Sequence, residues 1–439
     1  MIRDAIVIGA GISGLSAGYF LGKQEKDFLI IEAANSIGGL IASEWKDNYL
    51  LEYGPNTLRN PGGLLEEVII ELGLQGEVVA PAPSVSSNFI AYNGKLHPVP
   101  RSPLALLSSS LLGSTAIGTA ISEYFKRNSP SNSQETVADF FSRRLNTSIT
   151  ERLLKPFVSG IFAGDATQLE MKYAFPEQYN LERTYGSLIK GFIKTKKKPV
   201  RSFPRILSFK DGLSTLTTAM AASIKDSVIT GEKVTTIQKA DSYWNVVTDK
   251  ATYSTRAIIS TLPLWRSAGL FDLQISQPLY YPPISVVHLG YENSALTLPV
   301  SGFGFLVAPS EQADILGCIF SSSLFPERAP AGHQLFTVLM GGAINPEICN
   351  SNDKDLVAKA HLALSKYLRI SGHPTMTHIQ RLTHSIPQYN VGYGIILKAL
   401  DTFEQQNPGI HFLGNFKGGI SVINCLTNAH SLISKLTVA

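Results

Sequence analysis

A glycine-rich turn near the N-terminus restricts the fold of this chain more than any other feature. An apolar strand pattern at residues 4–9 (DAIVIG) runs into the turn GAGISG at residues 9–14, and a helical pattern follows from about Leu15 to Gly22. In a G-x-G-x-x-G turn, the first glycine permits the tight bend, the second lets the backbone approach a pyrophosphate, and the third lets strand and helix pack closely. The helix N-terminus then offers free N–H groups to the phosphates. The turn therefore predicts a dinucleotide-binding unit.

The residues after this turn indicate that the dinucleotide is FAD. A second apolar strand at residues 28–31 ends at Glu32, whose carboxylate can accept both hydroxyls of an adenosine ribose. Gly38 and Gly39 follow, and their bare backbone can pass close to the pyrophosphate and the ribityl chain. The order strand, turn, helix, strand predicts a parallel α/β unit. The acidic residue followed by a glycine pair resembles the extension in FAD enzymes of the glutathione-reductase type, which nicotinamide enzymes generally lack.

Length and composition exclude several classes of protein. The chain has 439 residues, 44% hydrophobic and 16% charged, which is typical of a globular protein of two or three interleaved lobes. A formal charge of +4 argues against nucleic acid as the main partner. Cys318, Cys349 and Cys425 are too few and too scattered to suggest a disulfide framework or a zinc site, so we expect a reducing, cytoplasmic setting. The apolar run Ala5–Ile8 is too short for the core of a signal peptide.

Two segments raise the question of a membrane contact. Leu104–Ile121 carries no charge but is rich in Ser, Thr and Gly, so it is either a partly buried helix or a helix lying on a membrane. Lys194–Lys198 is a basic run, for which a solvated surface is the plainer interpretation and a membrane or phosphate contact the second.

Hydrophobic periodicity predicts the remaining elements. They are a helix at 64–72, a hairpin from 91 followed by prolines up to 103, a helix at 211–222, short strands between 228 and 262, a mixed or antiparallel sheet between 284 and 340, and a final helix from 423. The prolines after the hairpin mark a domain boundary.

Six further segments carry more specific sequence. They are 52–57 (EYGPNT), 93–100 (NGKLHPVP), 156–165 (PFVSGIFAGD), 316–328 (LGCIFSS, then FPER), 386–389 (IPQY) and 414–425 (GNFKGGISVINC). Together with the glycine turn they resemble the FAD-dependent protoporphyrinogen/coproporphyrinogen oxidase family of the amine oxidase superfamily. The resemblance extends from residue 4 to residue 425, nearly the whole chain.

The resemblance implies an α/β chain (α+β overall) in three parts. These are a Rossmann-type FAD-binding domain of the glutathione-reductase type at 1–77, 207–264 and 400–439, a helical, membrane-facing lobe at 85–165, and a substrate-binding domain with a mixed sheet at 166–206 and 265–399. It also implies peripheral membrane contact and a homodimer.

The resemblance assigns the cofactor contacts residue by residue. The glycine turn would hold the pyrophosphate, Glu32 the ribose, Val234 the adenine, and the C-terminal block the carbonyl edge of the flavin. The full set is Gly9, Gly11, Ile12, Ser13, Gly14, Glu32, Ala33, Gly38, Gly39, Leu40, Gly54, Pro55, Asn56, Thr57, Val234, Gly414, Asn415, Ile420, Ser421 and Val422. Asn415 stands where many FAD enzymes of the wider class carry Asp.

Members of this family oxidise a porphyrinogen to a porphyrin by transferring hydride to flavin N5, so we expect no catalytic side chain and no metal. Protoporphyrinogen IX, in the late steps of haem or chlorophyll synthesis, is the first expectation, and oxygen or another oxidant would accept the electrons. Coproporphyrinogen III is the second. A flavin amine oxidase or carotenoid desaturase, and a non-catalytic binder of prenylated GTPases, are further alternatives. His97, His288, His384 and His411 are expected to be structural.

The expected substrate contacts are less well defined. They are Asn88, Gly160, Phe303, Leu306 and Phe320, with Phe305 beside them. The aromatic and aliphatic members would suit the face of a tetrapyrrole, but core residues would look the same in the sequence. Several relatives carry an Arg that pairs with a propionate where this chain has Asn88, so Arg59 and Arg101 are possible replacements.

Overall fold

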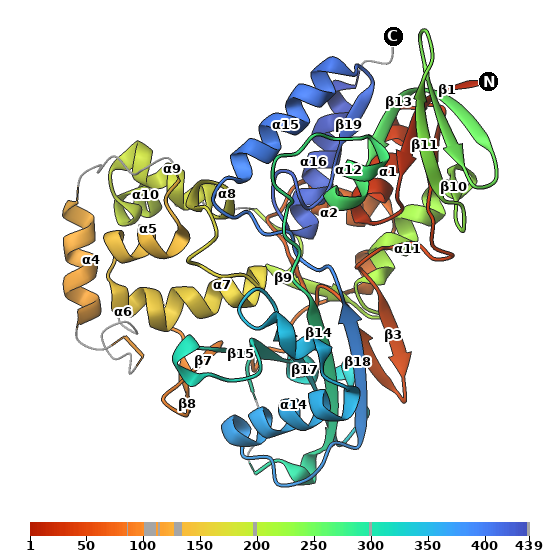
Figure 1. Ribbon diagram of the computed structural model, residues 1–439. Helices are drawn as coiled ribbons and strands as arrows, with labels where there is room; N and C mark the ends of the chain where they lie inside the picture. The colour runs from red at the N-terminus through yellow and green to blue at the C-terminus, as the bar shows by residue number, and fades with distance from the viewer. Residues whose placement is uncertain are drawn as a thin grey trace.

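The computed structural model describes residues 1–85, 87–100, 111–112, 115–126, 134–195, 200–297 and 301–436. Two seven-stranded sheets, two smaller sheets and a group of helices make up the described part of the chain, which passes repeatedly between them (Figure 1). The first and last helices lie side by side, so both ends of the chain belong to the same sheet region. Within the described ranges, no helix is long and apolar enough to cross a membrane.

The first sheet is built around the N-terminal strand. Five of its strands run parallel, and β12 and β11 continue it antiparallel from β13. In spatial order the strands are β10 (Val228–Ile229), β2 (Phe28–Ile31), β1 (Ile2–Ile8), β13 (Thr252–Ser260), β12 (Trp244–Thr248) and β11 (Val234–Lys239), with β19 (Ile410–Phe412) paired to β13. Observed β2 matches the predicted strand at both ends.

Helices cover this sheet on both faces, because successive residues of its central strands point to opposite sides. Val7 packs into the core that contains α1, whereas Ile6 and Ile8 pack into the core that contains α15. The first core holds α1 (Ile12–Lys23), α2 (Leu64–Glu71), α11 (Ser214–Ser223) and α16 (Val422–Lys435), and the second holds α12 (Leu264–Leu270) and α15 (Tyr393–Gln406).

The second sheet is antiparallel except where β15 pairs with β7, as the alternating apolar residues predicted. Its order is β18 (Met376–Leu382), β14 (Ile284–Glu292), β17 (His333–Gly341), β16 (Gly317–Phe320), β15 (Gly304–Val307), β7 (Phe89–Tyr92) and β8 (Lys95–Pro98). The helix α14 (Asp353–Leu368) covers one face. Short strands β3 (Ser43–Lys46), β4 (Tyr49–Glu52), β5 (Leu58–Arg59), β6 (Val78–Val79) and β9 (Ile206–Phe209) and the short helix α13 (Ser321–Leu324) complete the connections.

The helical group differs from the expected lobe at 85–165 in two ways. The hairpin β7–β8 belongs to the second sheet, and the helices continue beyond residue 165 because α9 and α10 pack against the earlier ones. The group comprises α4 (Thr115–Phe125), α5 (Val137–Arg144), α6 (Thr147–Ile149), α7 (Lys155–Phe162), α8 (Met171–Ala174), α9 (Pro176–Tyr185) and α10 (Leu188–Thr195). Residues 104–110 and 113–114 of the uncharged stretch and 196–198 of the basic run lie outside the described residues.

Candidate cofactor and substrate site

The glycine turn joins β1 to α1 in a geometry that side chains would block. Gly9 adopts φ +104°, and its N–H donates to the Ile31 carbonyl at 2.8 Å. A Cβ on Gly14 would lie 1.9 Å from the Gly9 oxygen, so a side chain there would force the turn apart. At Gly11 a Cβ would meet only the Gly39 Cα, at 4.0 Å. The space before the N-terminus of α1 is therefore open to a ligand.

The second glycine motif lies directly against the first. Gly38 N–H donates to the Ala10 carbonyl at 2.8 Å, and a bridge pairs Gly38 with Gly11. A Cβ on Gly39 would come within 3.2 Å of the Gly11 Cα. Both motifs thus form one cradle of bare backbone, in which Gly39 and its neighbour Leu40 are exposed.

Glu32 closes the cradle at the end of β2. Its Oε2 accepts from Ala10 N–H at 2.7 Å and its Oε1 from Ala34 N–H at 2.8 Å. The segment before Val234 lies beside it, because Glu232 N–H donates to the Glu32 carbonyl at 3.0 Å. Glu32, the predicted ribose contact, therefore lies next to the start of β11. Ala33, the residue after Glu32, is exposed to solvent.

The C-terminal block reaches the same edge of the sheet. The loop at 414–421 leaves β19 and ends at Ser421, whose side chain caps α16 by accepting from Asn424 N–H at 3.1 Å. The helix α16 packs against α1, and the Cys425 thiol in its first turn is hydrogen-bonded to the Ser13 side chain. Two helix N-termini therefore direct their positive ends toward the cradle, which favours an anionic ligand.

The loop at 53–57 passes on the other side of Leu40. Tyr53 N–H donates to the Ala42 carbonyl at 2.9 Å, and a Cβ on Gly54 would lie 2.0 Å from the Leu40 oxygen. The Asn56 side chain closes the loop by donating to the Gly54 carbonyl at 3.1 Å. Gly54, Pro55, Asn56 and Thr57 are all partly exposed next to the cradle.

A buried ion pair fixes the base of this loop. Arg328 Nη2 donates to Glu52 Oε1 at 2.9 Å and to Ser208 Oγ at 2.6 Å, and neither charged side chain is exposed. Glu52 also accepts from Leu213 N–H at 2.9 Å. Burial raises the pKa of Glu52 and lowers that of Arg328, so removal from water opposes both charges and their mutual contact supports them.

Among the predicted substrate contacts, the structure brings Gly160 and Leu306 together. A Cβ on Gly160 would lie 2.3 Å from Leu306 Cδ2, so α7 can approach β15 only because this residue is glycine. Phe303 immediately precedes β15, and its N–H donates to the Ser87 carbonyl at 2.9 Å. The next residue after Ser87, Asn88, is exposed. Arg59 is exposed on β5, and Arg101 lies outside the described residues.

Phe320, another expected substrate contact, lies in the core of the second sheet. Phe320 is 1% exposed and packs with Phe305 and Phe336 in the core beneath α14. Leu306, one residue after Phe305 on the same strand, points to the opposite face. Side chains alternate between the two faces of each strand, and the sequence does not say which face the substrate contacts.

The four histidines that were expected to be structural have different surroundings. His288 is fully buried, its Nδ1 lies 3.1 Å from Thr337 Oγ1, and burial together with the charges of His378 and Arg328 lowers its pKa to about 3. His97 contacts the Tyr92 carbonyl at 3.0 Å, His384 stacks on Trp265 with ring centroids 4.7 Å apart, and burial lowers the pKa of His411. Over the described ranges, no group of His, Cys, Asp and Glu could hold a metal ion.

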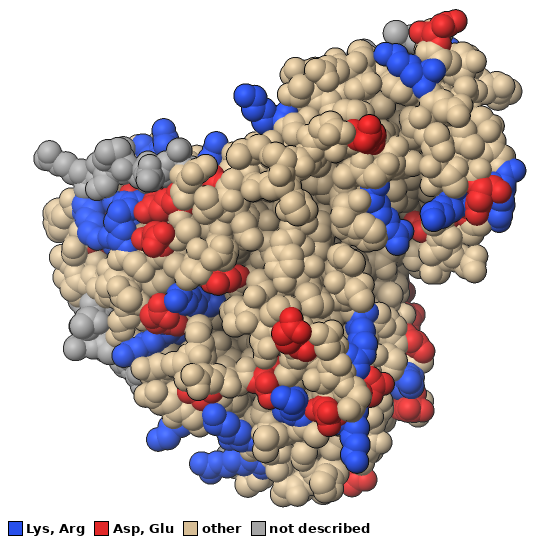
Figure 2. All heavy atoms as spheres, in the orientation of Figure 1, with Lys and Arg blue, Asp and Glu red and all other residues tan. Residues whose placement is uncertain are grey.

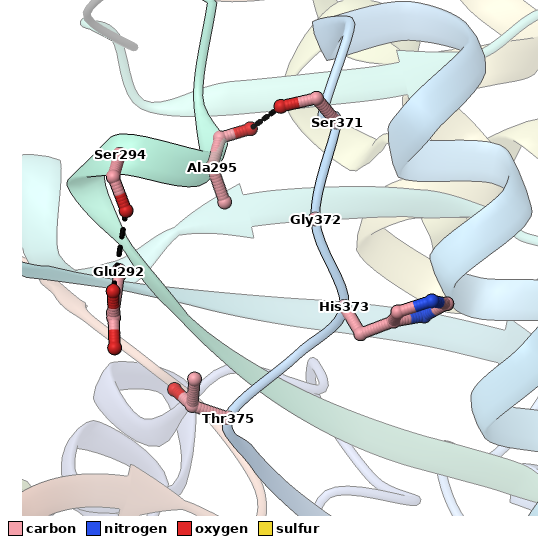
Figure 3. A pocket seen from close by; sticks show the side chains of 7 residues that line it. All are labelled: Glu292, Ser294, Ala295, Ser371, Gly372, His373 and Thr375. Atoms are coloured by element: carbon pink, nitrogen blue, oxygen red, sulfur yellow. Dashed lines mark hydrogen bonds between the residues drawn. The ribbon is translucent and has the colours of Figure 1, made fainter.

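A shallow pocket of about 330 Å³ lies outside the candidate site (Figure 3). It is formed where β14 ends and the segment before β18 begins, and its lining includes Glu292, Ser294, Ser371 and His373, all exposed. None of the predicted cofactor or substrate contacts lines it.

Sequence reasoning gave no role to several residues that support the site. Glu52 and Arg328 stand in segments that were recognised by their resemblance alone, and so do Gln388 and Tyr389. Tyr393 lies outside every motif, helix and strand that the sequence predicts.

Comparison with known proteins agrees with this arrangement. The chain matches the family described as flavin containing amine oxidoreductase over residues 12–423. It is 30% identical to the mitochondrial protoporphyrinogen oxidase of Nicotiana tabacum, over 97% of this chain and 93% of the relative. It is 26% identical to coproporphyrinogen III oxidase of Bacillus subtilis (strain 168), over 98% and 97%. A crystal structure from Exiguobacterium sp. 255-15 has the same fold, with a TM-score of 0.84, 22% identity and 98% coverage of both chains.

The protein is therefore an FAD-dependent oxidoreductase. It belongs to the flavin containing amine oxidoreductase family, and its curated relatives include protoporphyrinogen and coproporphyrinogen III oxidases. The residues present fit FAD, because the bare-backbone cradle, the Glu32 carboxylate and two helix N-termini meet at one edge of the first sheet.

Proposed function

We propose that this enzyme oxidises a porphyrinogen to the porphyrin, with protoporphyrinogen IX as the first candidate substrate and coproporphyrinogen III as the alternative. The observation that carries the proposal is the match over 97% and 98% of the chain to relatives with these two activities. A match of that extent includes the glycine cradle, the 53–57 loop and the α7–β15 contact together.

The chain's own residues would bind, orient and exclude water. The cradle at Gly9–Gly14 and Gly38–Leu40 would hold the pyrophosphate, Glu32 the ribose, Val234 the adenine, and the 54–57 and 414–422 segments the flavin. Bound FAD supplies a two-electron acceptor for hydride from the substrate. Gly160 and Leu306 would form an apolar wall that orients the substrate without proton transfer by a side chain. We assign the first sheet, with its parallel strands and its antiparallel β11–β13 extension, to the glutathione-reductase type.

The test is anaerobic mixing of the purified enzyme with each porphyrinogen, followed by flavin absorbance and porphyrin fluorescence. We expect flavin bleaching with protoporphyrinogen IX and porphyrin fluorescence on turnover. Bleaching with coproporphyrinogen III alone would establish the alternative substrate. A yellow protein that neither compound reduces would refute the proposal and favour an amine oxidase-like activity, and a colourless protein that FAD cannot reconstitute would favour a non-catalytic binder. Hydrogen peroxide formed in air would identify oxygen as the acceptor.

We also propose that the helices α4 and α10 contact a membrane surface. Ile121 and Phe125 on α4 are 57% and 72% exposed, and Phe192 and Ile193 on α10 are 48% and 64% exposed. Lys190 lies among them, with Nζ 5.2 Å from the Tyr124 ring centroid. Apolar side chains flanked by lysines suit the interface of an anionic bilayer. Basic and acidic side chains are interspersed over the face shown in Figure 2.

Sedimentation with vesicles of phosphatidylcholine and phosphatidylglycerol tests this contact. We expect the wild type to bind and Phe125→Ser to bind less. Leu362→Ser is the matched control, since Leu362 is 71% exposed but lies on α14. Equal binding by both variants would refute the assignment of this surface.

A further inference from the structure

Two buried tyrosines hold the 414–421 loop in place. The Tyr389 hydroxyl donates to the Asn415 carbonyl and accepts from Gly419 N–H at 3.2 Å. The Tyr393 hydroxyl donates to the Phe416 carbonyl at 2.5 Å. The two rings stack with centroids 4.3 Å apart and planes 15° apart. Three backbone groups of the loop therefore depend on two phenol oxygens.

These hydroxyls cannot be replaced by water. Tyr389 and Tyr393 are each 2% exposed, and burial is the main cause that raises the pKa of both, so both keep the proton that they donate. Removing a hydroxyl would leave loop N–H or C=O groups buried without a partner, which costs more than the hydrogen bond itself contributes.

The residue before Tyr389 bonds in a different direction. Gln388 is 1% exposed, and its Nε2 donates to the Phe162 carbonyl at 2.8 Å and to the Ile386 carbonyl at 2.9 Å. Phe162 is the last residue of α7, the helix that carries Gly160. A Cβ on Gly164 would lie 2.4 Å from Gln388 Oε1, so the helix end is packed directly onto this amide.

We propose that Gln388 and Tyr389 are positioning residues. They fix α7, which carries Gly160, relative to the loop at 414–421. Gln388 holds the end of α7, and Tyr389 holds the loop that leads into α16. Because the two are consecutive, the distance between the helix and the loop is set by one peptide unit. The role of Tyr389, the first half of the proposal, requires only that the loop contacts FAD. The role of Gln388, the second half, rests on the proposed function, the oxidation of a porphyrinogen.

The Tyr389 half is tested by cofactor binding. In Tyr389→Phe we expect the dissociation constant of FAD to rise about tenfold, the ratio that an unpaired buried group produces, and the midpoint potential of bound FAD to shift. Tyr291→Phe is the matched control, because Tyr291 is fully buried and bonded to His361 at 2.9 Å but belongs to the core beneath α14. We expect it to lower the melting temperature and leave FAD binding unchanged.

Wild-type affinity and potential in Tyr389→Phe would overturn this half, and so would equal losses in both variants. Should Tyr389→Phe fail to fold, Tyr393→Phe, which frees one carbonyl of the loop, gives the milder variant for the same measurements.

The Gln388 half is tested by the rate of flavin reduction. In Gln388→Met we expect wild-type FAD affinity and a wild-type visible spectrum. We expect anaerobic reduction by protoporphyrinogen IX to slow about tenfold, because the substrate is then misplaced relative to the flavin. Gln24→Met is the control, because Gln24 donates to the Ile433 carbonyl at 3.3 Å behind the first sheet. Unchanged reduction in Gln388→Met, or loss of FAD binding equal to that of Tyr389→Phe, would overturn the assignment. A wild type that no porphyrinogen reduces would instead refute the proposed function and leave the Tyr389 measurements valid.

Discussion

Gly11 and Gly14 belong to the same turn but have different surroundings, and this difference separates folding from cofactor binding. A Cβ on Gly14 would overlap the Gly9 oxygen at 1.9 Å, whereas a Cβ on Gly11 would have only an ordinary contact at 4.0 Å. We expect Gly14→Ala to destabilise even the FAD-free protein, by about 1–3 kcal/mol as overpacking does. Gly11→Ala should leave the FAD-free protein as stable as the wild type and abolish FAD retention.

Thermal unfolding of both apoproteins and the flavin content of both purified variants are the measurements. Retention of FAD by Gly11→Ala would show that the pyrophosphate does not pass in front of the α1 N-terminus. A wild-type melting temperature for the Gly14→Ala apoprotein would show that the turn can relax around an added methyl group.

Asn88 belongs to the same scale, because the family resemblance implies an arginine at this single position in several relatives. Asn88 is exposed beside Phe303, so an arginine there can reach a substrate carboxylate without entering the core. We expect Asn88→Arg to change the KM for the porphyrinogen more than the flavin content. Steady-state kinetics and the flavin absorbance of the same preparation test this, and identical kinetics would remove Asn88 from the substrate site.

At the scale of elements, local patterns predicted what local physics determines. The strand Phe28–Ile31 and the final helix were predicted to within one residue, because buried strands and capped helices leave short-range signals. The face on which Phe320 packs was not predictable, since strand alternation offers two equivalent faces. The contact between Glu52 and Arg328 was hidden for another reason, because the two residues are 276 positions apart and only the assembled fold brings them together.

The helical group provides an element-scale prediction through its buried charges. Glu123 on α4 is fully buried, where it pairs with Arg144 of α5 and accepts from the amides of Leu188 and Ile189 at the start of α10. We expect Glu123→Gln to cost about 1.5–3 kcal/mol, because it removes one of the two carboxylates paired with buried Arg144 and leaves Glu182 as the other. Asp314→Asn, which breaks the exposed pair with Lys359, should cost less than about 1 kcal/mol. Urea unfolding measures both.

The same group predicts the direction of a pH effect. Burial alone raises the pKa of Glu123, but hydrogen bonds from Arg144 and the two amides outweigh it and lower the pKa below 4.5. A carboxyl with a lowered pKa in the folded state contributes stability that is complete above pH 4.5 and is lost as the pH falls further. The difference in unfolding free energy between wild type and Glu123→Gln should therefore shrink in acid. A constant difference down to the lowest measurable pH would contradict this.

At the scale of the whole molecule, the ion pair of Glu52 and Arg328 joins two segments far apart in the sequence. Glu52 ends β4, just before the loop at 53–57, and Arg328 follows α13 in the connection between β16 and β17 of the second sheet. Ser208 on β9 and the Leu213 amide before α11 share the same contact, so four separate segments meet at one guanidinium–carboxylate pair. These segments are therefore held together by a contact whose strength depends on both charges being present.

This dependence predicts a penalty that changes with pH when Arg328 is replaced. Arg328 is the main group that lowers the pKa of Glu52 against the effect of burial, so in Arg328→Met that pKa rises further above 4.5. A carboxyl whose folded pKa is raised destabilises the fold at neutral pH and regains stability as the pH falls toward its unfolded value. We expect Arg328→Met to cost about 3–5 kcal/mol at neutral pH and distinctly less in mild acid. Adding Glu52→Gln should recover much of the loss at neutral pH, because no charge is then buried alone. Urea unfolding of the single and double variants at both pH values tests this, and an equal penalty at both would mean that Glu52 is not the group left unpaired.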